Sequence, residues 1–144
     1  MQLPLHPLVV HAPVLLVPLA AVGLVLWVLM PQWGYRLRYG QLVVSGVGVA
    51  TAQWAKLTGV TLLEDIGLTV AEPGDVADHL WWGSVQVIAA ASVFLCSCLL
   101  WWLAVNQKPG FVAAAAQLLS VVCGVIAFGV TIAAGHSGAE LVWG

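Results

Sequence analysis

Four histidines are the residues of this chain best suited to chemistry. They are His6, His11, His79 and His136, spread from one end of the sequence to the other. Neutral imidazole is the commonest metal ligand in proteins and a frequent axial ligand of haem iron. Whether these side chains act together depends on the elements that carry them.

The composition indicates that lipid surrounds most of those elements. Hydrophobic residues make up 62% of the 144 residues and charged residues only 7%, whereas soluble domains carry about 25% charged residues. A net charge of −2 offers no basic surface to nucleic acid. We interpret the three cysteines as small buried apolar residues, because all lie inside apolar runs: Cys96, Cys98 and Cys123.

Four apolar runs separated by polar breaks predict four transmembrane helices. The runs cover about residues 7–30, 40–60, 79–105 and 111–135. Each run reaches the roughly 20 residues that a spanning helix needs, and a helix satisfies its own backbone hydrogen bonds in lipid. The sequence therefore predicts a single all-α domain over residues 1–144, an up-and-down bundle. No internal repeat or second domain is evident.

Charged residues indicate the orientation of the bundle. Arg36, Arg38 and Lys108 lie in the first and third breaks, whereas the second break is acidic. Basic loops stay in the cytoplasm. Both termini and the acidic loop are therefore expected on the outer side of a bacterial inner membrane. Every histidine then lies toward that outer side.

These histidines support the hypothesis of a cofactor site at the outer end. An ionisable residue inside a span is a functional candidate, and an apolar bundle suits an apolar macrocycle, so we expect one or two b-type haems. His11 lies deepest and His136 is flanked by glycines, so these two are expected to be the most sensitive ligands. His6 and His79 would form a second axial pair or tune the first. Lys56 lies near the same end and could meet the propionates.

Two alternatives remain open at this point. The same four histidines could hold copper or zinc in a metal-binding or transport protein. The chain could also be a structural membrane subunit, in which Lys56 merely extends to the interface. No nucleophile–base pair, phosphate-binding loop or paired catalytic carboxylate is visible, so we do not expect a stand-alone enzyme.

Two terminal motifs resemble those of a known family. They are Leu5-His6-Pro7-Leu8-Val9-Val10-His11-Ala12-Pro13 and Gly135-His136-Ser137-Gly138-Ala139-Glu140-Leu141-Val142. They are similar to a bacterial family of small four-helix membrane proteins of unknown function, some of whose relatives are fused to Rieske or cytochrome modules. The resemblance covers essentially the whole chain, including His79. It implies a role near respiratory electron transfer, with membrane or periplasmic redox proteins as partners.

Eight tryptophans and stripes of small residues offer more contact surface than one bundle needs. We therefore expect a homodimer or a place in a larger complex.

The expected orientation is testable with reporter fusions. An alkaline phosphatase domain fused after Gly144 should be active, because that enzyme needs the periplasm, and a fusion in the break that holds Arg36 should be inactive. The reverse pattern would overturn the placement of all four histidines.

Overall fold

The computed structural model describes residues 5–107 and 110–144, and both ranges are helical without strands. The elements are α1 (Leu5–Val9), α2 (His11–Leu29), α3 (Pro31–Asp65), the short 3-10 helix η1 (Gly74–Val76), α4 (Ala77–Val105) and α5 (Phe111–Trp143). The predicted all-helical class is therefore confirmed. Lys108, used above for orientation, lies outside the described residues.

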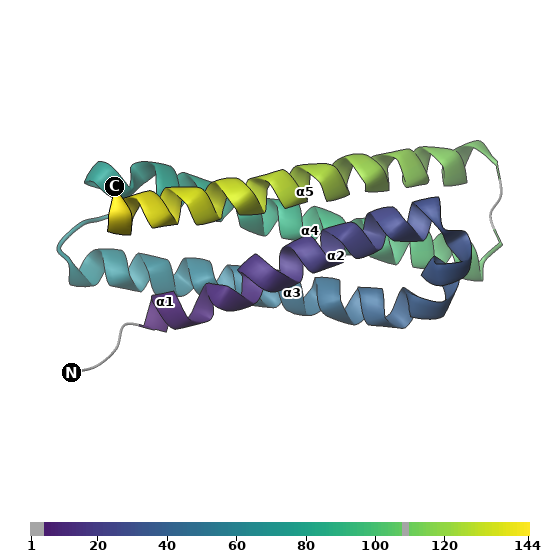
Figure 1. The fold of residues 1–144 in the computed structure, drawn as a ribbon, viewed down its shortest axis with the longest axis horizontal. Coiled ribbons are helices and arrows are strands. Elements are labelled where there is room, and N and C mark those ends of the chain that lie inside the picture. Colours follow the sequence, from purple (N-terminus) through teal and green to yellow (C-terminus); the bar gives the residue numbers. More distant parts are fainter. Residues whose placement is uncertain (1–4, 108–109) are drawn as a thin grey trace.

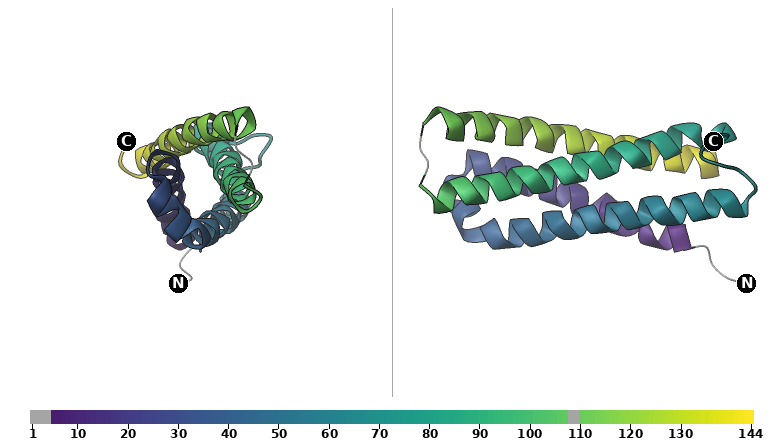
Figure 2. Two further views of the ribbon diagram at one scale, coloured as in Figure 1. Left: turned by 90° about the vertical axis from the view of Figure 1, so that its right-hand side faces the viewer. Right: turned by 180° about the vertical axis from the view of Figure 1, so that it is seen from behind.

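The four longer helices lie side by side as a bundle (Figure 1), and an end-on view shows them around a common axis (Figure 2). The main contacts of α2 are with α3 and α5, and those of α4 are with the same two helices. The short helix α1 packs against α3. The start of α1 and the end of α5 lie at the same end of the bundle (Figure 1).

Three stretches are long and apolar enough to cross a membrane, namely Leu5–Leu29, Gly74–Val105 and Phe111–Trp143. Their outward faces expose large apolar side chains, as a lipid-facing surface does. Within the described residues, α3 does not meet the same criterion, so only three of the four predicted spans are established. Its hydropathy is lowered by polar side chains along its length: Gln41, Ser45, Thr51, Gln53, Lys56, Thr58 and Thr61.

Proline explains the interruption between the first two helices. Pro13 has no N–H to donate to the carbonyl of Val9, and its ring crowds that carbonyl. The helix is interrupted at Val10, which separates α1 from α2. The interruption places His6 on α1 and His11 at the first position of α2.

A polar network ties three helices together in the core. The Gln41 side-chain amide on α3 donates to the carbonyl of Ala20 on α2 at 2.9 Å and to Ser97 Oγ on α4 at 3.1 Å. Ser97 is fully buried and donates to the carbonyl of Val93 at 2.8 Å. Buried polar groups are costly when left without partners, so this network favours one relative position of the three helices.

Small residues allow close helix contact. A Cβ added at Gly124 of α5 would lie 2.8 Å from Val25 Cγ2 and 3.1 Å from the carbonyl oxygen of Ala21. One of these atoms is backbone, so it cannot move aside without moving α2. Gly129, on the same helix, has no such neighbour within 4 Å.

These two glycines form a matched pair for a packing test. Gly124→Ala should lower the free energy of unfolding by about 1–3 kcal/mol, because overpacking forces the helices apart. Gly129→Ala should leave stability unchanged or raise it by up to about 1 kcal/mol through helix propensity. Thermal unfolding in detergent measures both, and equal stability of the two variants would contradict the packing between α2 and α5.

Candidate functional site

A cavity of about 560 Å³ lies at the end of the bundle where α1 begins and α5 ends. Its volume is typical of ligand pockets, which span about 300–1,000 Å³. The lining is mostly apolar, and its polar members are few: His6, His11, Lys56, His79 and Gln86. Four of the five predicted site residues therefore line one cavity.

His6 is held by the backbone of a neighbouring helix. Its Nδ1 lies 3.0 Å from the carbonyl oxygen of Ala55 on α3 and 3.3 Å from Thr58 Oγ1. A carbonyl only accepts hydrogen bonds, so Nδ1 of His6 carries the proton and donates it. In the neutral ring Nε2 then keeps its lone pair. The Thr58 hydroxyl donates to the same carbonyl at 3.0 Å.

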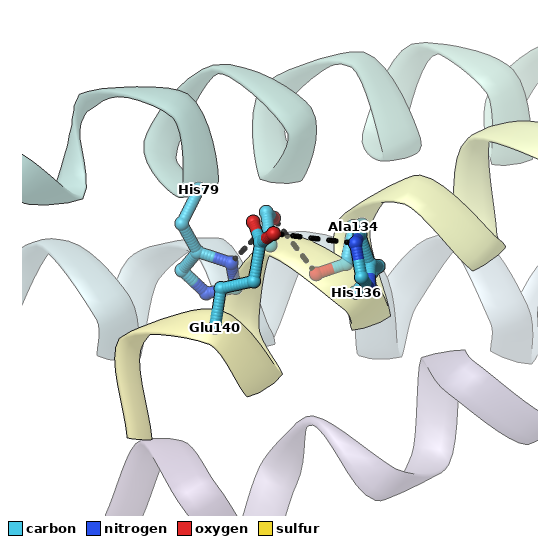
Figure 3. A network of polar contacts seen from close by, with 5 residues as sticks. His79, Ala134, His136 and Glu140 are labelled. Atoms are coloured by element: carbon cyan, nitrogen blue, oxygen red, sulfur yellow. Dashed lines mark hydrogen bonds and ion pairs between the residues drawn. The ribbon is translucent and has the colours of Figure 1, made fainter. Parts of the chain in front are cut away.

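His79 is held in a similar way by α5. Its Nδ1 lies 3.2 Å from Ser137 Oγ, and the Ser137 hydroxyl lies 3.1 Å from the carbonyl of Ala134, to which it donates (Figure 3). A serine hydroxyl has one hydrogen, so here Ser137 Oγ accepts from Nδ1–H of His79. The lone pair of this ring is again on Nε2.

Glycines make room for both imidazoles. A Cβ added at Gly59 would lie 3.0 Å from Cε1 of His6, and one added at Gly138 would lie 2.9 Å from Cε1 of His79. Each histidine thus packs against one short segment of the neighbouring helix. In that segment an alanine is followed three residues later by a serine or threonine, whose hydroxyl donates to the alanine carbonyl, and the next residue is a glycine. We call these two arrangements the imidazole seats.

The imidazole seats occupy equivalent positions of an internal repeat that the sequence analysis missed. In this repeat α2 corresponds to α4 and α3 to α5, and corresponding positions are buried together. The buried pairs are Pro13 and Gln86, Val17 and Ala90, Ala20 and Val93, Leu24 and Ser97, Gln41 and Ser120, Ser45 and Gly124, Gly48 and Ala127, and Ala52 and Thr131. The helix contacts described above have the same two-fold pattern.

The repeat brings two histidines from different halves together. The ring centroids of His6 and His79 are 6.0 Å apart, and their planes make an angle of 77°. Two imidazoles that hold one metal ion from opposite sides have ring centres roughly 6 Å apart, since each metal–nitrogen bond is about 2 Å long. The observed separation matches that geometry.

The other two predicted ligands lie differently. His11 is exposed but lines the cavity. His136 does not line the cavity, its side chain is 73% exposed, and its Nε2 lies 3.3 Å from Glu140 Oε1 (Figure 3). The expectation that His11 and His136 are the most sensitive ligands stays a prediction, but the geometry singles out His6 and His79.

A bare metal site of three or more protein donors is not found in the part of the chain that the structure describes. No group of three histidines, cysteines or carboxylates gathers there. Within those residues, two imidazoles are the most that the cavity brings close together.

Gln86 is a site residue that the sequence analysis did not identify. It is buried, lines the cavity, and its Nε2 has no hydrogen-bond partner among the described residues. A buried amide without a partner costs free energy, so it favours a ligand that carries an acceptor. The available signal was an amide inside an apolar run, together with the Ala-x-x-Thr-Gly and Ala-x-x-Ser-Gly patterns that form the imidazole seats.

The sequence pattern of a family described as "Predicted membrane protein (DUF2231)" matches residues 2–144. The chain belongs to this family. Membership confirms the resemblance indicated by the terminal motifs, and it identifies this DUF2231 chain as a membrane protein. Comparisons with curated proteins and with solved structures find no match. The bacterial origin and the Rieske and cytochrome fusions stay predictions.

The imidazole seats predict the tautomer of both rings. In this DUF2231 protein labelled with ¹⁵N-histidine, at a pH where both rings are neutral, His6 and His79 should each carry the proton on Nδ1 and a lone pair on Nε2. His6→Gln and His79→Gln variants assign the two signals in an NMR spectrum. Ser137→Ala should change the signal of His79 and leave that of His6 unchanged. Protonation of Nε2 in both neutral rings would rule out the seats as described.

Proposed function

We propose that this protein binds one b-type haem in the cavity, with His6 and His79 as its axial ligands, and that it carries electrons at the outer face of the membrane. The observation that carries the proposal is the pair of seated imidazoles, 6.0 Å apart between ring centroids, each with a free Nε2 lone pair.

The number of available donors favours haem over a bare metal ion. Zinc usually takes four ligands, of which the protein supplies three or four. Haem iron receives its equatorial ligands from the macrocycle and needs the protein only at its axial positions. Two close imidazoles in a mostly apolar cavity supply that requirement. Copper or zinc, with His11 or another donor recruited, is the alternative that the experiment below distinguishes.

Ligation by two histidines favours electron transfer over catalysis. When protein side chains fill both axial positions, no position remains for oxygen or a substrate to bind the iron. The hydrogen bonds from Nδ1 to Ala55 and Ser137 would fix the orientation of each ring and increase its basicity. The role of the protein is then to hold the group, exclude water and tune its potential.

Other polar side chains of the cavity could interact with the propionates of a haem. Lys56 lines the cavity, and its ammonium could neutralise a propionate, as expected from the sequence. The unpartnered amide of Gln86 could donate to a second carboxylate or hold a water. His11 would act as a neighbouring polar group rather than a ligand.

The membrane topology that suits this role has four spans and both termini outside. In this arrangement α3 crosses the membrane with Gln41 and Ser45 buried inside the bundle. Its outward positions include the apolar Val43 and Leu57, and also the polar Gln53 and Thr61. The site then faces the periplasm of a bacterial inner membrane, where redox proteins, or a second copy of the chain, could exchange electrons with it.

Histidine variants test the proposal directly. The protein purified after haem-replete expression should show a Soret band, and His6→Ala and His79→Ala should each lower haem occupancy by about tenfold or more, the loss expected from roughly 1.4 kcal/mol or more of binding energy. His136→Ala is the matched control and should retain the band, because its side chain is exposed and does not line the cavity.

The outcomes separate the candidate functions. A wild-type protein without a Soret band would refute the haem proposal, and copper or zinc found by elemental analysis of that sample would support the metal alternative. A band that survives the loss of both His6 and His79 but disappears in His11→Ala and His136→Ala would restore the ligand pair expected from the sequence.

A further inference from the structure

A second cavity, also of about 560 Å³, lies at the opposite end of the bundle. Its walls come from α2, α3, α4, α5 and the segment after α4. Apolar side chains such as Val28, Leu100 and Leu103 form one part of the lining, and Tyr35, Arg38 and two glutamines form the other. The haem proposal makes no use of this cavity, so the two stand independently.

Arg38 is the residue of this cavity best suited to bind a ligand. Its Nε is buried and has no hydrogen-bond partner among the described residues. Its guanidinium carbon lies 4.1 Å from the ring centroid of Tyr35 and 4.9 Å from that of Tyr39. The guanidinium carbon lies over both rings, and these cation–π contacts restrain the group. Its N–H groups can donate parallel hydrogen bonds to the oxygens of a phosphate.

No carboxylate neutralises Arg38 in the described ranges. The ion pair found there joins His136 and Glu140 at the other end of the bundle. Arg38 therefore combines a fixed positive charge, an unsatisfied donor and an adjoining apolar wall. An anion that carries an apolar chain matches all three features.

We propose that this cavity binds an anionic phospholipid, with its phosphate on the Arg38 guanidinium and its acyl chains against the apolar wall. Trp27, which also lines the cavity, is of a residue type that favours the headgroup level of a bilayer. Basic residues at that level attract anionic lipid. The bilayer itself supplies this ligand, so no soluble anion is needed.

Arg36 provides the matched control. It lies two residues earlier on the same helix with the same charge, but it is exposed and does not line the cavity. A general attraction of anionic lipid to this end of the protein would involve both arginines equally, whereas a built site depends on Arg38.

Native mass spectrometry with added lipid tests the proposal. The wild-type protein should retain phosphatidylglycerol and release phosphatidylcholine, which is zwitterionic. Arg38→Gln should weaken phosphatidylglycerol retention by about tenfold or more, because it removes the charge-assisted hydrogen bonds to the phosphate. Arg36→Gln should match the wild type. Arg38→Lys, which keeps the charge but loses Nε and the planar fork, should fall between Arg38→Gln and the wild type.

Several outcomes would overturn the proposal. Equal losses in Arg36→Gln and Arg38→Gln would indicate attraction by surface charge alone. Equal retention of the two lipids would show that the cavity does not select an anionic lipid, which contradicts the proposal. Displacement of phosphatidylglycerol by equimolar glycerol 3-phosphate would show that the site takes a soluble phosphate and not a lipid. Circular dichroism verifies folding of each variant, and Arg38→Lys carries the test if Arg38→Gln does not fold.

Discussion

The hydrogen bonds from imidazole Nδ1 to the neighbouring helices are the interactions on which the candidate site depends. A helix carbonyl normally accepts a hydrogen bond from the N–H four residues later, yet the Ala55 carbonyl also accepts one from His6 Nδ1. The Ser137 hydroxyl, which donates to the Ala134 carbonyl, accepts a hydrogen bond from His79 Nδ1. These bonds need helix pairs in close contact, and Gly59 and Gly138 provide that closeness. The same bonds determine which nitrogen is left for a ligand. The packing of the helices and the tautomers of His6 and His79 are thus linked.

The buried polar side chains of this bundle mostly form hydrogen bonds within the protein, because a polar group without a partner is costly in an apolar environment. Gln41 donates a hydrogen bond to Ser97 in the core. The hydroxyls of Ser45, Ser120 and Thr131 donate to backbone carbonyls of their own helices. Because so many polar groups are satisfied internally, the exceptions carry information. Gln86, Arg38 and Trp101 each have a buried nitrogen without a partner in the described part of the chain. Gln86 and Arg38 line the two cavities, at opposite ends of the bundle, and Trp101 lines neither.

The helical class and the gathering of histidines toward one end could be predicted from the sequence, because apolar run lengths and the position of a residue along a run are one-dimensional properties. Which of the four histidines lie close together could not be predicted in this way. His6 and His11 lie five residues apart and both line the cavity, and their positions in the sequence do not show which of the two rings contacts the backbone of α3. His136 and Ser137 are neighbours, yet one is exposed and the other buried. The flanking glycines drew attention to His136, whereas Gly138 serves His79 instead.

The internal repeat separates the histidines into two classes. His6 and His79 are counterparts, whereas His11 and His136 correspond to Ser84 and Leu57, which cannot repeat their chemistry. Each hairpin of two helices therefore contains one imidazole seat, formed by His6 and α3 in the first half and by His79 and α5 in the second. The close pair of rings needs both hairpins. The segment between α3 and α4 joins the two hairpins in one chain, so the halves need not be identical, and His11 and His136 each belong to one half alone.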